Sequence, residues 1–412
     1  MSPEVVTSEG CGRGVLLASV AIMTQPASQP LVEPFLGGPP TVSVTGYRDV
    51  GQVGGVRIVE VETRNHLAEA DPEGFERVSA QVSELMSETV AAGIGRSRRP
   101  IVGPGSAMRV HELNPTSERL SLLASGYWEE WRNLVPSAMA LLPIQAPHTT
   151  HMPGPGPTEL PANRDFFVHI SDAIGIRSRA EVLKDVIRGS TDAGPVGPTW
   201  LSLACGAALP VLQTAAQMAT PVTVDLVDLD PMALGYAVSF AEALGLADRV
   251  RCMQADLLNL DQLTDALRLG QPGRGESAES YGRVDDAADL RPGVDADAWE
   301  GYDFVEMMGF FEYLPDEPQQ AGVMTIPSAG EFLETALSLA APGGLVVFGN
   351  MLTTHPQIDF TLKVVQWPYV RPRSLEQLVD LVTNVGVAPD QVTIYTPDDG
   401  VYAVVAIEVP AV

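Results

Sequence analysis

From Thr199 onward, short apolar runs alternate with segments of helical spacing along most of the remaining chain. A strand that is buried on both faces is apolar throughout, and each parallel partner requires a crossover connection, usually a helix. The alternation therefore predicts an α/β fold with a parallel sheet and crossover helices. The expected strands are residues 200–204, 223–227, 250–254, 304–308 and 345–349.

Two more strand-like runs, 391–395 and 402–409, follow near the end of the chain. The turn residues DDG lie between them, so we expect these two strands to pair antiparallel. Between the third and fourth expected strands, residues 270–300 are acidic, contain Gly and Pro, and show no hydrophobic period. Such a composition predicts a surface insertion.

The part of the chain before this pattern divides by composition. Residues 1–40 are rich in Gly, Pro and Ser, which predicts a poorly ordered leader. Residues 41–163 are expected to form an N-terminal region with a β-hairpin at 41–64 and helices at 71–93 and 116–142. We expect this region to act as a lid that covers the carboxyl edge of the sheet and selects the substrate. Residues 164–412 then form the domain that contains the sheet.

Charge and cysteine content exclude several kinds of partner. The chain has 25 basic and 52 acidic residues, a net charge of −27, whereas nucleic acids and anionic membranes are bound through basic patches. No run reaches the ~20 apolar residues of a membrane span. Three cysteines form neither a disulfide framework nor a metal cluster, which favours a cytoplasmic location. His148 and His151 lie in a proline-rich loop without an apparent third ligand, so no metal is expected. The oligomeric state stays open, a dimer included.

The ends of the first four expected strands carry the residues with most functional meaning. Ligands of a doubly wound sheet bind at the carboxyl ends of its strands. The first strand ends in Ala204-Cys205-Gly206, the second at Asp228, the third at Asp256, and the fourth in EMMGFFEYLPD, residues 306–316. An acidic residue at the end of the second strand can accept hydrogen bonds from both hydroxyls of a ribose. An acidic residue at the end of the third strand can accept one from an adenine amino group. Their order, about 25 residues apart, predicts a nucleoside site.

With these residues in place, the chain resembles the class I S-adenosylmethionine-dependent methyltransferases over roughly residues 165–409. The resemblance rests on WLSLACGAALP, VDLVDLDPMAL, RVRCMQADLLNL, YDFVEMMGFFEYLP and APGGLVVFGN. It implies a Rossmann-like, seven-stranded sheet with a reversed last strand, and S-adenosyl-L-methionine as the cofactor. The cofactor-binding residues that it implies are Ala204, Cys205, Gly206, Asp228, Leu229, Asp256, Leu257, Met308, Gly309 and Arg177.

The turn after the first strand departs from the usual pattern of that family. Ser202 stands where an acidic residue is usual, and Ala204 and Ala208 replace two glycines. We expect the site to persist, because alanine permits a tight approach where φ is negative and Gly206 remains for the most demanding position. The contact to the amino group of the cofactor is the one that this departure puts in question.

Several further side chains are candidates for binding or catalysis, each with a structural alternative. Arg177 or Arg179 could hold the carboxylate of the cofactor, or lie on a solvated helix face. Tyr313 and His169 are the candidate catalytic groups, although a histidine packed in a helix is the more ordinary interpretation of His169. The candidate substrate-binding residues are Asn350, Trp367 and Arg371, of which Arg371 could equally form a surface ion pair.

These features favour methyl transfer to a small-molecule or lipid-like acceptor, on oxygen or nitrogen, in specialised metabolism. LACG-A and VVQWPYVRPRS also resemble a narrower branch with hydroxy fatty acid methyl ester synthases and azetidine-2-carboxylate-forming enzymes. Attack on the aminocarboxypropyl arm, with release of methylthioadenosine, is therefore an alternative. A non-catalytic scaffold is another. A dinucleotide oxidoreductase would need G-x-G-x-x-G, of which LACGAALP keeps one glycine.

Overall fold

The computed structural model describes residues 30–38, 40–94, 115–123, 131, 134–135, 137–149, 151–153, 158–159, 168–190, 197–260, 263–264, 267, 301–321, 324–367 and 369–411. The predicted insertion at 270–300 lies outside the described residues, as does most of the predicted leader at 1–40. No helix in the described part is long and apolar enough to cross a membrane.

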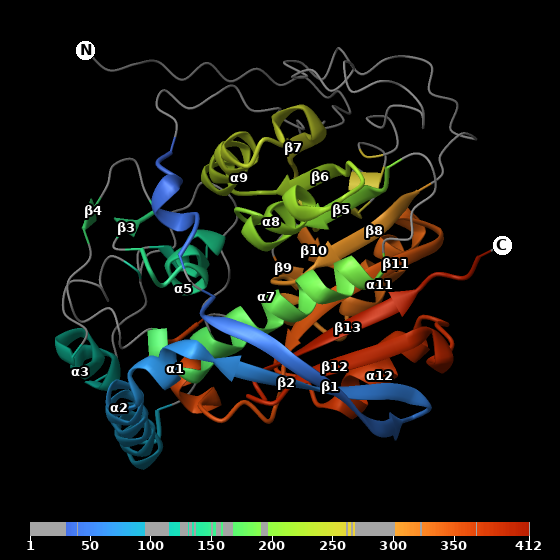
Figure 1. Ribbon diagram of the computed structural model, residues 1–412. Coiled ribbons are helices and arrows are strands. Elements are labelled where there is room, and N and C mark those ends of the chain that lie inside the picture. Colours follow the sequence, from blue (N-terminus) through green and yellow to red (C-terminus); the bar gives the residue numbers. More distant parts are fainter. Residues whose placement is uncertain are drawn as a thin grey trace, which may run out of the picture.

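One large sheet forms the centre of the molecule (Figure 1), with the strand order β1-β2-β12-β13-β11-β8-β5-β6-β7. Its strands are β1 (Val42–Val53), β2 (Val56–Asn65), β5 (Thr199–Leu203), β6 (Thr223–Asp228), β7 (Val250–Gln254), β8 (Tyr302–Met307), β11 (Ala340–Met351), β12 (Val392–Pro397) and β13 (Tyr402–Glu408). The strands β7, β6, β5, β8 and β11 run parallel, and β13 is antiparallel to both β11 and β12. The predicted fold class, with its reversed last strand, is therefore confirmed.

The N-terminal hairpin lies elsewhere than expected. β1 and β2 pair antiparallel, as the alternation predicted, but β2 also runs parallel to β12, with Ile58 opposite Ile394. The hairpin thus extends one edge of the sheet instead of covering its carboxyl ends, and the sheet has nine strands rather than seven. β2 buries Val56, Ile58 and Val61, as a strand inside a sheet does, and β1 forms the edge.

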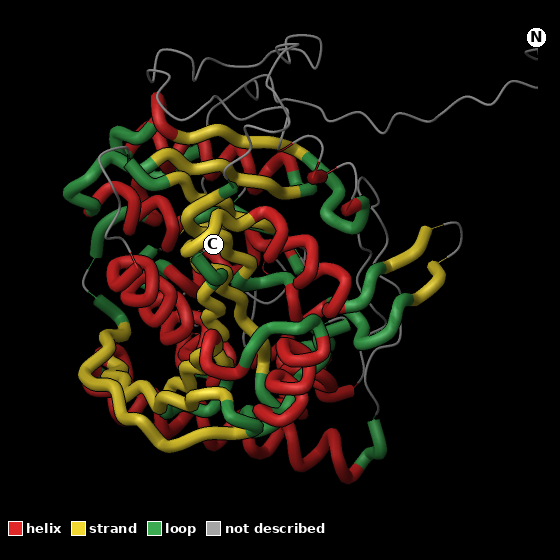
Figure 2. The backbone as a smooth tube through the Cα atoms, turned by 90° about the vertical axis from the view of Figure 1, so that its right-hand side faces the viewer, coloured by secondary structure: helices red, strands yellow, loops and turns green. Residues whose placement is uncertain are grey.

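Helices cover both faces of the sheet (Figure 2). On one face, α7, α8 and α9 contribute Val182, Leu212 and Phe240 to one apolar core. On the other, α11 and α12 contribute Phe332 and Leu378 to a second core. The α-helices are α1 (His66–Ala70), α2 (Pro72–Ala91), α3 (Pro115–Leu123), α5 (Leu142–Gln145), α7 (Ser171–Ser190), α8 (Leu209–Gln217), α9 (Pro231–Ala243), α11 (Ala329–Leu339) and α12 (Leu375–Asn384).

Shorter elements complete the described part. The short helical turns are η1 (Glu33–Phe35), η2 (Ala138–Leu141), η4 (Ala247–Arg249), η8 (Phe311–Tyr313), the π-helical η9 (Phe360–Val364) and η10 (Pro389–Gln391). Two small sheets pair β3 (His151–Met152) with β4 (Thr158–Glu159) and β9 (Gln319–Ala321) with β10 (Met324–Ile326).

A third apolar core joins the N-terminal helices to the carboxyl edge of the sheet. It contains Val82 of α2, Leu120 of α3 and Phe360 of η9, together with Met351 at the end of β11 and Tyr402 at the start of β13. The helical part of the N-terminal region therefore packs at the edge where ligands of such a sheet bind. The hairpin of this region thus extends one edge of the sheet, whereas its helices pack at the carboxyl ends of the strands.

Candidate functional site

The turn between β5 and α8 is built on left-handed backbone. Ala204, Gly206 and Ala208 have φ of 50°, 56° and 53°. The expectation that the two alanines have negative φ is therefore wrong. Left-handed conformation costs a residue with a Cβ roughly 1–2 kcal/mol, and the geometry of the turn imposes it here. A Cβ at Gly206 would lie 2.5 Å from Cβ of Ala138, so glycine is required there for space as well.

Asp228 lies at the end of β6 and binds that turn directly. Its Oδ2 accepts a hydrogen bond from the Gly206 N–H (2.7 Å), and its Oδ1 accepts from the Asp230 N–H (2.8 Å). Burial raises the pKa of Asp228 to about 6, although these amide donors oppose the change. The Leu229 N–H is a third backbone donor to this carboxylate, which has about four lone-pair sites, so one acceptor position remains beside the turn. Asp228 can thus both hold the turn and accept from a ribose.

The ends of β6 and β7 are joined by several local hydrogen bonds. The Ala255 N–H donates to the Asp228 carbonyl (3.1 Å), and Gln254 Nε2 donates to the Leu229 carbonyl (3.0 Å). Asp256 Oδ1 accepts from the Leu258 N–H (3.0 Å), which leaves its other oxygen for a ligand. Leu257 is buried in the apolar core. The structure therefore brings the predicted nucleoside residues to one edge.

Cys205 lies within the same turn. Its N–H donates to the Val227 carbonyl (3.1 Å), which joins the turn to β6. Burial raises the pKa of its thiol well above the usual value, and the neighbouring Asp228 carboxylate adds to the effect. The thiol is thus neutral, and the cofactor contact predicted for Cys205 stays a prediction.

Glu306 on β8 supplies a carboxylate beside Ser202, the position where the sequence lacks one. The two residues are opposite each other in the β5–β8 register, and the Ser202 hydroxyl donates to Glu306 Oε1. The Met308 N–H donates to Glu306 Oε2 (3.0 Å). Burial raises the pKa of Glu306 to about 7, against these donors and the nearby Arg179. Sequence reasoning missed Glu306, and the only available signal was an acidic residue inside an otherwise apolar strand.

Arg177 and Arg179 occupy different environments although both lie on α7. Arg177 donates to the carbonyls of Ile144 (3.2 Å) and Val168 (2.7 Å), and burial lowers its pKa to about 10. These contacts join α5 and the segment before α7 to the helix. The predicted cofactor contact of Arg177 stays a prediction, and its present partners favour a structural role.

Arg179 points to the carboxyl end of β8. Its guanidinium stacks on the Tyr402 ring, 4.2 Å from the centroid, and its Nη1 lies 3.7 Å from Glu312 Oε2. A Cβ on Gly309 would lie 3.6 Å from its Nη2. Arg179 is 5% exposed, and its Nη1 has no hydrogen-bond partner among the described residues. A buried, incompletely paired guanidinium at this edge is suited to an anionic group of a ligand.

The predicted substrate residues lie on or beside the segment that follows β11. The Trp367 indole N–H donates to the Tyr313 hydroxyl, and Trp367 packs against Trp131 at 5.6 Å between ring centroids. Gln366 and Tyr369, which flank Trp367, have φ of 60° and 61°. Strained backbone of this kind clusters at functional sites. This segment and Tyr313 are therefore the best-supported part of the predicted substrate region.

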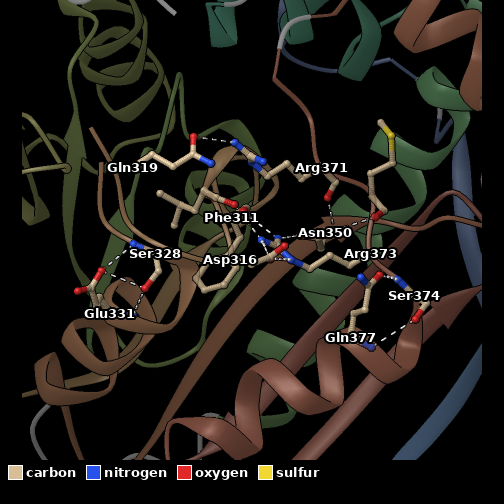
Figure 3. Close-up of polar contacts among 12 residues, drawn as sticks. Phe311, Asp316, Gln319, Ser328, Glu331, Asn350, Arg371, Arg373, Ser374 and Gln377 are labelled. Atoms are coloured by element: carbon tan, nitrogen blue, oxygen red, sulfur yellow. Dashed lines mark hydrogen bonds and ion pairs between the residues drawn. The ribbon is translucent and has the colours of Figure 1, made fainter. Parts of the chain in front are cut away.

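Asn350 and Arg371 have mainly structural contacts (Figure 3). Asn350 is fully buried and accepts a hydrogen bond at Oδ1 from Arg373 Nη1 (2.7 Å). Arg373 also donates to the Leu314 carbonyl (2.8 Å) and to Asp316 Oδ1 (2.8 Å). Arg373, which sequence reasoning missed, thus joins the end of β11 to the segment after β8. Arg371 Nη2 donates to Gln319 (3.3 Å), and substrate roles for Asn350 and Arg371 stay predictions.

His169 lies at the start of the helical segment that leads into α7. It is 5% exposed, and its ring packs edge-on against Phe75 of α2 at 6.2 Å between centroids. This environment agrees with the interpretation as a packed histidine more closely than with a catalytic base. A catalytic role for His169 stays a prediction.

No protein-family profile matches the chain, and no curated protein does. Among solved structures, a possible exported protein from Bordetella parapertussis has a TM-score of 0.50 at 16% identity, over 81% of this chain and 97% of its own. A magnesium protoporphyrin IX methyltransferase from Synechocystis PCC 6803 has a TM-score of 0.39 at 12% identity, over 72% of this chain and 100% of its own. An O-methyltransferase family protein from Burkholderia thailandensis has a TM-score of 0.37 at 16% identity, over 60% of this chain and 61% of its own. At these identities the likeness concerns the fold.

Proposed function

We propose that this chain is an S-adenosylmethionine-dependent transferase that methylates a small-molecule or lipid-like acceptor on oxygen or nitrogen. The observation that carries the proposal is the position of Asp228 and Asp256. Asp228 ends β6, Asp256 follows the neighbouring strand β7, and Asp228 binds the Gly206 turn after β5. Acceptors in this order at the carboxyl edge of such a sheet suit the ribose and the adenine of a bound nucleoside.

The residues at β8 suit the other end of that cofactor. Its amino-acid part carries a carboxylate and an ammonium group. Arg179 Nη1 has no hydrogen-bond partner among the described residues and is suited to the carboxylate. Glu306 can accept from the ammonium in place of the acidic residue that Ser202 replaces. We infer that the residues present fit both ends of S-adenosylmethionine, with Met308 and Gly309 in between.

The chemistry that the cofactor supplies when bound is an activated electrophile at its sulfonium. The protein then needs to align a nucleophile at about 3–3.5 Å and to exclude water. Burial, together with the Glu312 carboxylate, raises the pKa of Tyr313 well above its usual value. Tyr313 is therefore a neutral phenol that orients an acceptor oxygen or nitrogen rather than a phenolate base. Trp367 holds that hydroxyl in position.

A second candidate reaction is attack on the aminocarboxypropyl arm, with methylthioadenosine as the leaving group. The buried guanidinium of Arg179 beside the carboxylates of Glu306 and Glu312 favours this candidate. Such groups could anchor the carboxylate and the ammonium of a folded arm. We also propose that the protein acts in specialised metabolism, in the cytoplasm, and as a dimer.

Incubation with S-adenosylmethionine, with and without candidate acceptors, tests the proposed function. We expect S-adenosylhomocysteine to form only when an acceptor is present. Methylthioadenosine formed without an acceptor would support attack on the arm instead. Binding without either product, over a broad acceptor set, would support a non-catalytic scaffold.

A further inference from the structure

Three buried carboxylates interact electrostatically with the guanidinium of Arg179. Glu306 and Glu312 are each 4% exposed and Asp172 is 7% exposed. Glu312 Oε2 lies 3.7 Å from Arg179 Nη1, and the charges of Arg179 and Glu306 also influence each other. Asp172 accepts a hydrogen bond from the Tyr402 hydroxyl (2.8 Å). We call Arg179, Glu306, Glu312 and Asp172 the Arg179 cluster.

Among the described residues, the elements packed against the cluster bring one further guanidinium and one imidazole near it. Arg373 influences Glu312 from the segment after β11, but it is already paired with Asp316 at 2.8 Å. His355 Nε2 lies 3.9 Å from Asp172 Oδ1, and burial lowers the pKa of His355, which favours its neutral form.

The remaining titratable neighbours in the described part of the chain do not supply a further cation. Burial raises the pKa values of Tyr313, Tyr402 and Cys205, so these groups stay neutral in the usual pH range. When its carboxylates are ionised, the Arg179 cluster therefore has more negative than positive charge.

The incomplete pairing of Arg179 Nη1 is a second sign that a ligand completes the cluster. Burying a charged nitrogen without a hydrogen-bond partner is costly. Arg179 is 5% exposed, and among the described residues its Nη1 has only the ion pair with Glu312 at 3.7 Å and no hydrogen bond. A ligand with one anionic group and additional positive charge would satisfy both the guanidinium and the surplus carboxylates. S-adenosylmethionine has this pattern, with a carboxylate, an ammonium group and a sulfonium.

We propose that the Arg179 cluster makes the site select the positively charged sulfonium nucleoside over the neutral thioether nucleoside that methyl transfer leaves behind. Glu312 is the specificity-determining residue in this proposal. The proposal rests on the proposed function, because it takes S-adenosylmethionine as the ligand. Loss of the sulfonium charge removes the attraction of the surplus carboxylate, so the product is released more readily than the substrate.

The ionisation of the cluster supports the proposal with a measurable consequence. Burial raises the pKa of both Glu306 and Glu312 to about 7, and the positive charge of Arg179 opposes that rise. Below that pH the carboxyl groups are protonated in the free protein and the surplus charge is lost. A cationic ligand favours the ionised form. Its affinity should therefore increase as the pH rises to about 7 and level off above it, with proton release on binding.

The test is a calorimetric titration of the wild-type protein with S-adenosylmethionine and with S-adenosylhomocysteine, from about pH 5.5 to about pH 8.5. We expect the preference for S-adenosylmethionine to increase about tenfold across this range, the equivalent of one unit of pKa change. Glu312→Gln should flatten this dependence, and Glu306→Gln serves as a second variant in case the first does not fold. Glu334→Gln, on an exposed part of α11, is the matched control and should behave as the wild type.

Two results would overturn the inference. One is a preference that does not change with pH in the wild type, and the other is a Glu312→Gln variant with the same pH dependence as the wild type. If neither nucleoside binds at any pH, the proposed function fails and the inference fails with it. Binding of both nucleosides with an unchanging ratio leaves the proposed function intact and rejects only the charge selection.

Discussion

The two halves of the candidate site are constructed differently. On the β5–β6–β7 side, the acidic residues are held by backbone N–H groups close in sequence or on the neighbouring strand, such as Asp230 and Gly206 for Asp228. On the β8 side, charged side chains from distant segments meet, as Arg179 of α7 meets Glu312 of η8. Local backbone hydrogen bonds hold the acidic residues of the β5–β6–β7 side in place before a ligand binds. On the β8 side, the charged side chains are incompletely paired until a ligand binds.

The largest expected effect concerns the first half. Asp228→Ala should weaken S-adenosylmethionine binding about 100-fold or more, because two charge-assisted hydrogen bonds of about 1.5–3 kcal/mol each are lost. The Gly206 N–H also loses its acceptor, so we expect a lower melting temperature as well. Calorimetry and thermal melts measure the two effects, and Asp228→Asn is the control that keeps an acceptor. Unchanged affinity in the alanine variant would remove Asp228 from the site.

The next effect compares two arginines on one helix. Arg179→Lys should weaken S-adenosylmethionine binding about tenfold, because lysine cannot reproduce a bidentate contact to a carboxylate. Arg177→Lys should lower the melting temperature but leave the affinity nearly unchanged, because Arg177 donates to two backbone carbonyls. The opposite pattern in calorimetry would show that the sequence-based choice of Arg177 was right.

Most of the fold and half of the site could be predicted from the sequence. Parallel strands and local turns leave regular spacing, so the strands, the reversed last strand and the positions of Asp228 and Asp256 were accessible. The roles of Glu306 and Arg179 were harder to predict from the sequence. They depend on the pairing of β5 with β8 and on the packing of α7 against Tyr402. The hairpin was predicted as a hairpin, but its pairing with β12 is a contact across more than 300 residues.

A smaller effect is the dependence of stability on pH in the ligand-free protein. The pKa values of Glu306 and Glu312 are raised from 4.5 to about 7. Their contribution to stability is therefore fully present below about pH 4.5 and is lost as the pH rises through about 7. Melting curves of Glu312→Gln should show a weaker decline over this range than the wild type. If the variant and the wild type had the same pH dependence of melting, the pKa of Glu312 would not be raised by burial.

The smallest effect concerns the β5 turn. Ala204→Gly should increase the free energy of unfolding by up to about 1 kcal/mol, because glycine removes the cost of left-handed backbone at φ 50°. Ala207→Gly is the control in the same turn. Ala207 does not have positive φ, so glycine should lower stability there by about 0.5–1 kcal/mol. Denaturant titration distinguishes the two, and equal losses in both variants would contradict the left-handed turn.

The most direct test of the site is a calorimetric titration of the wild-type protein with S-adenosylmethionine, set beside one with a nicotinamide dinucleotide. The acidic residues at the ends of β6 and β7 and the incompletely paired Arg179 lead us to expect saturable binding of S-adenosylmethionine and none of the dinucleotide. Binding of the dinucleotide alone, or of neither ligand, would contradict a site for S-adenosylmethionine at this edge of the sheet.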